Sequence, residues 1–306
     1  MKVLVATEKP FSKVAVDGIK KIVEGAGYKF AALEKYTSPQ ELYAAVADAD
    51  ALIVRSDKVT KEVIDAAKNL KIVVRAGAGF DNLDLAACTA RGIVAMNTPG
   101  QNSNAVAELA ICFMIFMSRN QLTAGTGMEL KGKTLGIQAY GNVGRLVANH
   151  AKGFGMNIMA FDPFVPAEAM EKEGVRVAKD LEDLYSHSNF VSLHIPATEQ
   201  TKNSIGYNLL SKMPKGGCLI NTARKEVINE AELIKALEER EDLKYITDVA
   251  TANHESIAAK FGKRVFGTPK KMGAETAEAN INAGLAAANQ IVDFIKTGNK
   301  KFQVNK

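Results

Sequence analysis

The 306-residue chain has few cysteines and no long apolar run, and each shortage narrows what the protein can be. Its three cysteines, Cys88, Cys112 and Cys218, are odd in number, widely spaced and set in apolar surroundings. This pattern favours buried thiols in a reducing cytosol over a disulfide framework. The longest apolar stretch, residues 109–117, falls short of the ~20 residues that span a bilayer. The apolar N-terminal stretch is too short for a signal peptide. We therefore expect a cytoplasmic protein that does not bind membranes.

The chain also lacks blocks of like charge, internal repeats and low-complexity linkers. Its net charge is +5, but lysines and acidic residues alternate along it, so nucleic acid is not an expected partner. A mild positive balance is compatible with a small anionic substrate. The composition, with 47% hydrophobic and 24% charged residues, is ordinary for a globular protein. The length suits two domains of moderate size.

Short apolar runs alternate with helical patterns, as expected for parallel sheets covered on both faces. In the first half, the predicted strands are residues 2–7, 29–34, 51–56, 71–77 and 93–97. A long apolar helix is predicted at 103–121 and a final helix at 276–297. Between these helices, the predicted strands are 134–140, 157–162, 175–178, 190–196, 218–223 and 245–250. The predicted fold class is α/β, with two doubly wound parallel-sheet domains.

A glycine-rich junction at residues 139–144, AYGNVG, joins a predicted strand to a predicted helix. It is the dinucleotide fingerprint G-x-G-x-x-G with alanine in the first place. Gly141 would let a pyrophosphate approach the backbone, and Gly144 would let the helix pack closely on the strand. The expected cofactor contacts in this turn are Tyr140, Gly141, Asn142, Val143 and Gly144.

An acidic residue, Asp162, follows the last glycine of this junction by 18 residues, at the end of the next predicted strand. An acid there accepts hydrogen bonds from the adenosine ribose and repels a 2′-phosphate. The sequence therefore predicts an NAD site, with NAD preferred over NADP. The alternative is an ordinary glycine-rich turn with a surface aspartate.

Several stretches, in this order, are similar to those of the D-isomer-specific 2-hydroxyacid dehydrogenases, most closely to the phosphoglycerate dehydrogenase branch in a short form. They are RAGAGFDNLD (75–84), NTPGQNSNAVAELA (97–110), the turn at 139–144, LHIPAT (193–198), LINTAR (219–224), TDVA (247–250) and TPKKMGAET (268–276). The resemblance implies a flavodoxin-like substrate domain, residues 1–98 and 281–306, with an inserted Rossmann NAD-binding domain, residues 99–280. It also implies an active site between the domains, a homodimer formed through the Rossmann domains, and no serine feedback through a C-terminal regulatory domain.

The resemblance assigns substrate contacts to single residues. Arg224 matches the arginine that holds the substrate's carboxylate and 2-oxygen, a task suited to a planar bidentate guanidinium. The loop Ala76, Gly77, Ala78 and Gly79 matches the one whose N–H groups cradle the carboxylate. Its alternative is an ordinary glycine turn. The remaining matches on the substrate side are Arg55 and Ser56, at the substrate phosphate, and Asn102.

Arg55 has a plainer alternative, an exposed cation at a strand end. The resemblance also assigns residues to the adenine and nicotinamide pockets, and Asp248 would meet the nicotinamide carboxamide. The residues of these pockets are His194, Pro196, Thr222, Ala223, Asp248 and Gly273. No metal site is expected.

The stretch TPKKMG (268–273) departs from the family pattern. Most of the family has an acid–base histidine after the TP, and a glutamate that pairs with it. Here Asn253 takes the place of the glutamate. Counting back from Gly273 puts Lys271 at the histidine position, whereas counting forward from Thr268 puts Lys270 there. We favour Lys271.

The absence of the family histidine and the absence of the glutamate that pairs with it fit together physically. A free lysine has a pKa of about 10.4, and a carboxylate partner would raise it further. Neighbouring cations and desolvation lower it. We therefore expect a lysine to take the substrate hydroxyl proton while hydride leaves C2 for NAD⁺. The alternatives are two solvated surface lysines, or His254 as the acid–base group.

The resemblance, with Arg55 and Ser56 at the position of the substrate phosphate, implies NAD-dependent oxidation of D-3-phosphoglycerate to 3-phosphohydroxypyruvate, the entry to serine biosynthesis. Two alternatives stay open. One is a dehydrogenase for glycerate, glyoxylate, hydroxypyruvate or another small 2-hydroxyacid. The other is a corepressor-like NAD-binding protein without turnover, which the missing histidine–glutamate pair would favour.

Overall fold

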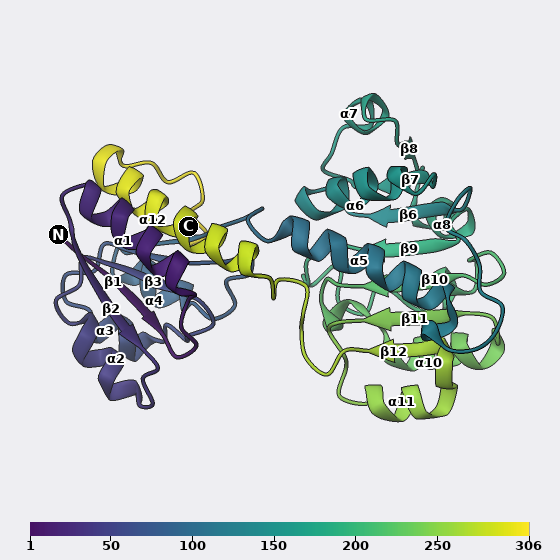
Figure 1. Cartoon of the computed structure of the whole chain (residues 1–306), viewed down its shortest axis with the longest axis horizontal. Coiled ribbons are helices and arrows are strands. Elements are labelled where there is room, and N and C mark those ends of the chain that lie inside the picture. The colour runs from purple at the N-terminus through teal and green to yellow at the C-terminus, as the bar shows by residue number, and fades with distance from the viewer. Residues whose placement is uncertain (306) are drawn as a thin grey trace. The chain divides into compact units, whose positions relative to one another are not determined.

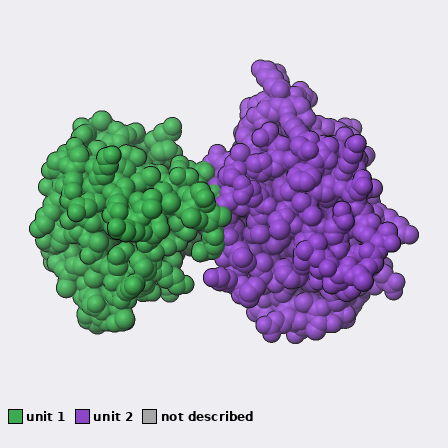
Figure 2. Space-filling model, in the orientation of Figure 1, with its two compact units in different colours: residues 1–102, 275–306 green, residues 103–274 purple. Residues whose placement is uncertain are grey.

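The computed structural model describes residues 1–305, which form two compact units (Figure 1). Unit 1 comprises residues 1–102 and the chain from residue 275 onward, and unit 2 comprises residues 103–274 (green and purple in Figure 2). The sequence placed these boundaries after residues 98 and 280. The second boundary lies earlier because the last helix, with its N-cap Thr276, belongs wholly to unit 1.

Unit 1 contains a parallel sheet in the order β2-β1-β3-β4-β5, which is the flavodoxin-like order. Its strands are β1 (Lys2–Thr7), β2 (Lys29–Glu34), β3 (Ala51–Val54), β4 (Ile72–Arg75) and β5 (Val94–Asn97). Its helices are α1 (Lys13–Gly25), α2 (Pro39–Val46), α3 (Lys61–Ala66), α4 (Leu85–Ala90) and α12 (Ala277–Thr297). Ile19 of α1 and Ala287 of α12 share one apolar cluster, whereas Leu42, Val63 and Cys88 share the other. Helices therefore cover both faces of the sheet, which explains its near-continuously apolar strands.

Unit 2 contains a second parallel sheet in the order β12-β11-β10-β9-β6-β7-β8. Its strands are β6 (Thr134–Gln138), β7 (Asn157–Phe161), β8 (Arg176–Val177), β9 (Phe190–Leu193), β10 (Cys218–Asn221), β11 (Lys244–Thr247) and β12 (Val265–Gly267). Its helices are α5 (Ser103–Ser118), α6 (Asn142–Gly153), α7 (Ala167–Lys172), α8 (Leu181–Ser186), α9 (Tyr207–Leu210), α10 (Glu230–Glu239) and α11 (His254–Phe261), with 3₁₀ turns η1 (Asn120–Leu122), η2 (Lys225–Val227) and η3 (Gly262–Arg264). Read from β8, the strand order is that of a Rossmann fold with an added edge strand. The predicted α/β class with two parallel-sheet domains is confirmed.

Several predicted elements end one to three residues earlier than the apolar pattern suggests, and at two of them the backbone shows why. The strand predicted to reach residue 140 ends at Gln138, because Ala139 adopts a left-handed φ of 77° that turns the chain toward α6. The helix predicted to reach residue 121 ends at Ser118, and Asn120, Gln121 and Leu122 have φ values of 53°, 59° and 57°. In both places a left-handed backbone ends the element although the side chains would let it continue.

The cysteines are buried at two positions and exposed at the third. Burial raises the pKa of Cys88 to about 11 and that of Cys218 to about 12, so both are neutral thiols. Cys112 is exposed on α5, so the prediction of three buried thiols is wrong there. Its neighbours Ile111 and Phe113 occupy the buried face of the helix instead.

None of the helices within residues 1–305 combines the length and the apolar character that crossing a bilayer requires.

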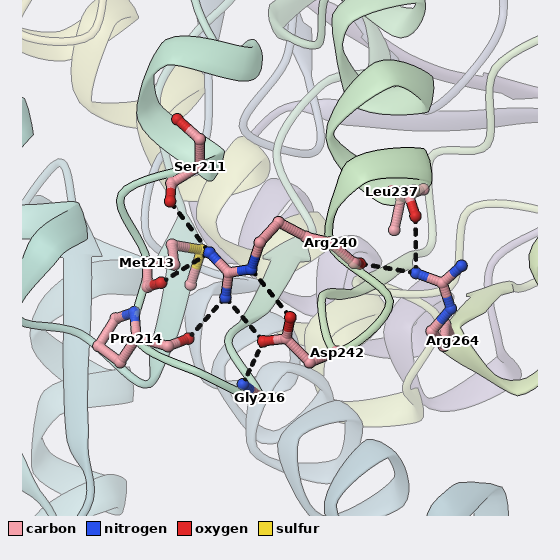
Figure 3. A network of polar contacts seen from close by, with 8 residues as sticks. All are labelled: Ser211, Met213, Pro214, Gly216, Leu237, Arg240, Asp242 and Arg264. Atoms are coloured by element: carbon pink, nitrogen blue, oxygen red, sulfur yellow. Dashed lines mark hydrogen bonds and ion pairs between the residues drawn. The ribbon is translucent and has the colours of Figure 1, made fainter.

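A single guanidinium ties the end of α10 to the loop after α9 in unit 2 (Figure 3). Arg240 donates to the carbonyl oxygens of residues 211, 213 and 214 at 3.0–3.2 Å, and to both carboxylate oxygens of Asp242 at 2.9 and 2.7 Å. The carboxylate also accepts from the N–H of Gly216 at 2.6 Å. The guanidinium, and next the Gly216 N–H, hold the pKa of Asp242 well below its usual range.

Replacing Arg240 with methionine should therefore lower the free energy of unfolding by about 2–3 kcal/mol, since hydrogen bonds to charged groups contribute about 1.5–3 kcal/mol each. Denaturant unfolding at several pH values measures this. A carboxylate with a lowered folded-state pKa stabilises the fold above its unfolded-state pKa, and that contribution is lost as the pH falls through the folded-state pKa. The variant should lose this part of the acid dependence. Unchanged stability at neutral pH would contradict the account.

Candidate functional site

The glycine-rich turn connects β6 to α6 in unit 2. Ala139, in the first glycine place of the fingerprint, has a φ of 77°, which costs a residue with a β-carbon about 1–2 kcal/mol. Gly141 is the N-cap of α6, and no side chain within residues 1–305 caps that helix end. The first N–H groups of α6 are thus left for solvent or for an anionic ligand.

The two glycines of the turn differ in what surrounds them. A β-carbon at Gly144 would lie 2.3 Å from the carbonyl oxygen of Ala139, so this glycine lets α6 pack against the strand. A β-carbon at Gly141 would meet no atom of residues 1–305 within 4 Å. The fold therefore needs a glycine at 144, whereas at 141 only the approach of a ligand would require one.

This difference predicts opposite outcomes for two alanine substitutions. Gly144→Ala should unfold at a markedly lower temperature, because the added methyl group meets backbone and cannot be relieved by a side-chain rotation. Gly141→Ala should keep the parental melting temperature but bind NAD⁺ at least ~10-fold more weakly, because the methyl group stands where the pyrophosphate approaches. Thermal unfolding with and without NAD⁺ measures both. Parental NAD⁺ affinity in Gly141→Ala would contradict the assignment.

Asp162, which is predicted to accept hydrogen bonds from the ribose, also holds the backbone of the turn. Its Oδ2 accepts from the N–H of Tyr140 at 2.7 Å, and its Oδ1 accepts from the N–H of Phe164 at 2.8 Å. An ionised carboxylate has about four acceptor sites, so capacity remains for ribose hydroxyls. The Tyr140 side chain is buried, with its hydroxyl 2.8 Å from Glu173 and the Arg145 guanidinium over its ring. Only the backbone of Tyr140 is left to contact a nucleotide.

The other predicted cofactor residues follow neighbouring strands of the same sheet. β6 pairs with β9, β9 with β10, and β10 with β11, all in parallel. The carboxyl ends of these strands therefore lie along one edge, beside the glycine-rich turn, where open α/β sheets bind ligands. The residues that this edge brings together are His194 and Pro196 after β9, Thr222 and Ala223 after β10, and Asp248 after β11.

Three of these residues have buried polar atoms with no hydrogen-bond partner within residues 1–305: His194 Nε2, the Thr222 hydroxyl and Asp248 Oδ1. Such atoms are uncommon in folded proteins and call for an explanation. Burial lowers the pKa of His194 to about 3, so its ring is neutral. A neutral ring, a hydroxyl and a carboxylate oxygen are suitable partners for the amide and hydroxyl groups of a dinucleotide, so these residues fit NAD.

Arg224 is held at the end of β10 by a residue that sequence reasoning missed. The buried Asn221 accepts from the N–H of Ala223 at 3.0 Å and donates to the carbonyl of Arg224 at 2.9 Å. Thr247 in turn donates to the Asn221 carbonyl at 2.8 Å. The Arg224 side chain is half-buried and donates to the Ala223 carbonyl at 2.9 Å. Asn221 thus fixes the turn from which the guanidinium projects.

The lysine loop, residues 268–273, follows β12, and two side chains hold its backbone in place. Asp248 Oδ2 accepts from the N–H groups of Met272 and Gly273 at 3.1 and 2.7 Å. The Thr268 hydroxyl donates to the Lys270 carbonyl at 2.7 Å. The side chains of Lys270 and Lys271 are both exposed. The backbone of this loop is therefore anchored while its two cations face outward.

His254, the alternative acid–base residue, is only 7% exposed. Its Nε2 lies 2.2 Å from where a β-carbon of Gly267 would be, so the ring packs against β12. Desolvation lowers its pKa, which keeps it neutral at neutral pH. Asn253, at the position of the family glutamate, donates to Glu230 at 2.5 Å. This placement makes His254 a poor candidate to exchange protons with a substrate.

In unit 1, Arg55 at the end of β3 is held rather than free in solvent. Its guanidinium donates to the carbonyls of Lys9 and Pro10, both at 3.4 Å, and to the Asn280 side chain. It also lies over the ring of Phe11, 5.3 Å from the centroid. These contacts argue against the alternative of a freely exposed cation, and leave Arg55 half-buried beside the β1–α1 loop.

The loop 76–79 begins where β4 ends. Gly77 has a φ of 152°, and its missing β-carbon makes room for Arg75, whose Nη1 would lie 1.7 Å from it. Arg75 Nε donates to the Arg55 carbonyl at 3.0 Å. Sequence reasoning missed Arg75, although its place directly before the glycine loop is a signal. Of the other predicted substrate residues, Ser56 is exposed after β3 and Asn102 is half-buried at the last position of the first segment.

Comparison with known proteins identifies the family of this chain. Residues 113–270 match the family model for the D-isomer specific 2-hydroxyacid dehydrogenase, NAD binding domain. The chain therefore belongs to the D-isomer specific 2-hydroxyacid dehydrogenase family, and unit 2 carries the NAD-binding domain of that family.

Individual relatives extend the likeness to the whole chain. A crystal structure of NAD⁺-bound 3-phosphoglycerate dehydrogenase from Entamoeba histolytica has a TM-score of 0.90 and 51% identity, covering 100% of this chain and 99% of that one. The D-3-phosphoglycerate dehydrogenase of Methanocaldococcus jannaschii is 39% identical over 272 residues, 84% of this chain and 52% of that protein. The hydroxypyruvate reductase of Thermotoga maritima is 36% identical over 275 residues, 84% of this chain and 88% of that protein. The chain spans about half the length of the first curated phosphoglycerate dehydrogenases it matches.

Proposed function

We propose that the protein is an NAD-dependent dehydrogenase that oxidises D-3-phosphoglycerate to 3-phosphohydroxypyruvate, the entry to serine biosynthesis. The observation that carries the phosphorylated substrate is the pair of guanidinium groups in unit 1. The Arg75 guanidinium donates to the backbone carbonyl of Arg55 at 3.0 Å and lies against Gly77, and the Arg55 guanidinium is held by the carbonyls of Lys9 and Pro10. Arginines held in this way suit a phosphate. The likeness to phosphoglycerate dehydrogenases, at 51% identity over the whole chain in one case, supports the same substrate.

In this proposal, each group of residues has one task. Arg224 binds the substrate carboxylate and the oxygen on C2, and the N–H groups of loop 76–79 bind the same carboxylate. Arg55, with Ser56, binds the phosphate, and Asn102 contributes a polar contact. The glycine-rich turn, Asp162 and the polar groups at the ends of β9, β10 and β11 bind NAD.

A lysine of the 268–273 loop serves as the acid–base group. When bound, NAD⁺ supplies the hydride acceptor for C2. The neutral amine of the lysine takes the hydroxyl proton, the C–O bond becomes a carbonyl, and the lysine becomes an ammonium. In the reverse direction the ammonium returns the proton to the ketone oxygen. The buried ring of His254 supports a lysine over this histidine, whereas the exposure of Lys270 and Lys271 is also what two solvated surface lysines would show.

One observation favours a second candidate. The Thermotoga maritima relative is a hydroxypyruvate reductase, and this chain covers 88% of it. Reduction of hydroxypyruvate uses the same carboxylate and 2-oxygen contacts but has no phosphate to bind. The importance of Arg55 therefore distinguishes the two functions, and measurable turnover of either substrate excludes a purely NAD-binding role.

The test is NADH formation with D-3-phosphoglycerate, D-glycerate and D-lactate, for the parent and for Arg55→Ala. The proposal expects D-3-phosphoglycerate to have by far the highest kcat/KM. It also expects Arg55→Ala to raise KM for D-3-phosphoglycerate while leaving KM for D-glycerate unchanged. Equal kcat/KM for phosphorylated and unphosphorylated substrates would contradict it.

A homodimer formed through unit 2 is part of the proposal. Ile115 and Phe154 are 37% and 45% exposed there. Both line a surface cavity of about 310 Å³ that also includes Met128 and Leu130. The lining also contains Ser118, Arg119, Glu129 and Lys131, and exposed apolar side chains rimmed by polar ones are typical of a contact face. Light scattering of the purified protein should give twice the monomer mass, and Phe154→Glu should give the monomer mass.

A further inference from the structure

Two consecutive carbonyl groups of the loop after β4 are held by residues at the end of β5. Asn97, the last residue of β5, is 9% exposed, and its Nδ2 donates to the Ala78 carbonyl at 2.6 Å. The N–H of the next residue, Thr98, donates to the Gly77 carbonyl at 3.0 Å. β4 and β5 are paired strands, with Arg75 opposite Asn97, so these contacts continue the sheet beyond its last paired residues.

Holding the carbonyls fixes where the loop's N–H groups point. In a trans peptide the C=O and the following N–H lie on opposite sides of the chain, and residues 1–305 contain no cis peptide. The N–H groups of Ala78 and Gly79 must therefore face away from residues 97–98. Within residues 1–305, neither N–H group donates a hydrogen bond. Successive N–H groups on one side form an anion-binding concavity.

From this geometry we propose that Asn97 is a positioning residue: it turns the peptide between Ala78 and Gly79 so that its N–H faces the substrate carboxylate. Asn97 does not touch the substrate and acts only through the loop. The inference rests on the proposed use of loop 76–79 in binding the carboxylate.

The loop needs such a contact because its own backbone is permissive. Ala78 stands between Gly77 and Gly79, and glycines allow the intervening peptides to rotate at little steric cost. Without a donor at position 97, the peptide between 78 and 79 would sample both orientations. In the flipped orientation a carbonyl oxygen, rather than an N–H, would face the carboxylate and repel it.

Two substitutions at position 97 separate two effects: removal of the hydrogen-bond donor, and its replacement by a hydrogen-bond acceptor. Leucine has a similar size and only removes the donor. Aspartate has the same shape but presents an acceptor to the Ala78 carbonyl, so it favours the flipped peptide, in which the N–H of Gly79 donates to the new carboxylate. We expect KM for D-3-phosphoglycerate to rise about 10-fold in Asn97→Leu and at least about 100-fold in Asn97→Asp. Because each tenfold change corresponds to about 1.4 kcal/mol, the aspartate variant should lose about twice as much binding free energy as the leucine variant. KM for NAD⁺ should stay within about twofold of the parent in both variants.

A matched control is Asn305, which lies near the C-terminus and contacts the backbone at β5. Asn305 is 5% exposed, accepts from the N–H of Ala95 at 2.7 Å and donates to the carbonyl of Ile93 at 2.9 Å. Asn305→Ala therefore removes an equally buried side-chain contact to β5, away from loop 76–79. It should lower the melting temperature and leave KM for D-3-phosphoglycerate unchanged. Repeating the Asn97→Asp assay at high salt screens simple charge repulsion, whereas the effect of a flipped peptide should persist.

The inference is overturned if Asn97→Leu and Asn97→Asp keep the parental KM for D-3-phosphoglycerate, if KM for NAD⁺ rises equally, or if Asn305→Ala raises the substrate KM as much. A parent protein without turnover would contradict the proposed function instead. Calorimetric titration of the parent and both variants with D-3-phosphoglycerate then decides the role of Asn97. Binding that weakens in the order parent, leucine, aspartate supports the role, and equal or absent binding overturns it.

Discussion

Alanine in place of the acid–base lysine is expected to lower kcat for D-3-phosphoglycerate oxidation by ~10² or more, the usual effect of losing a general acid–base group. We expect this loss for Lys271→Ala. Lys270→Ala is the matched control, because it removes the same charge from the same exposed loop and should lower kcat far less. Both variants should keep the backbone of the loop in place, since that backbone is held by Asp248 and Thr268.

The pH profile identifies the lysine as a base rather than a simple cation. Oxidation needs the neutral amine and reduction needs the ammonium, so kcat for oxidation should rise with pH while kcat for reduction falls. Lys271→Ala should lose this dependence, and added primary amines should restore part of the rate. Normal turnover in both alanine variants would refute the lysine mechanism. In that case His254→Gln is the next variant, although the buried, neutral ring predicts only a change in stability.

Replacing Arg224 with lysine is expected to lower kcat/KM for D-3-phosphoglycerate by at least ~10², because a charge-assisted hydrogen bond contributes about 1.5–3 kcal/mol and a point charge cannot reproduce two parallel ones. The effect should fall on substrate binding and on the rate together, since Arg224 would hold both the carboxylate and the oxygen that changes charge. NAD⁺ affinity should stay at the parental value, because Asn221 holds the turn through backbone contacts that do not use the guanidinium.

The exposed neighbour Lys225 provides the control for Arg224. Lys225→Ala removes one positive charge one residue away and should leave kcat/KM unchanged. A loss of similar size in both variants would indicate a general electrostatic effect rather than a specific contact. Parental kcat/KM in Arg224→Lys would contradict the assignment of Arg224.

The architecture was largely predictable from the sequence, because each buried strand of a parallel sheet is a short apolar run between helical patterns. The runs beginning at Lys2, Lys29 and Asn157 begin where the structure has strands β1, β2 and β7. β12 was missed because three residues, Val265–Gly267, are too few to show a period. The ends of β6 and α5 were misplaced because backbone conformation, not side-chain character, ends them.

Site residues were predictable from the sequence only where the chemistry of the residue itself indicates its role. The different needs for glycine at 141 and 144 could be read from the fingerprint, and the structure shows the crowding at Gly144 directly. Residues that act through distant partners could not be read. Asn221 and Asn97 acquire their roles from contacts with other turns, and the Tyr140 ring faces Glu173 rather than a nucleotide.

The most direct test of the account is a single turnover of D-3-phosphoglycerate deuterated at C2, with NAD⁺ and excess enzyme. The account predicts that the deuterium is recovered in the reduced nicotinamide, that NADH formation is slower than with the protiated substrate, and that Lys271→Ala slows it by ~10² or more. If no deuterium reached the cofactor, or if D-3-phosphoglycerate gave no reduced cofactor while D-glycerate did, the proposed reaction would be contradicted.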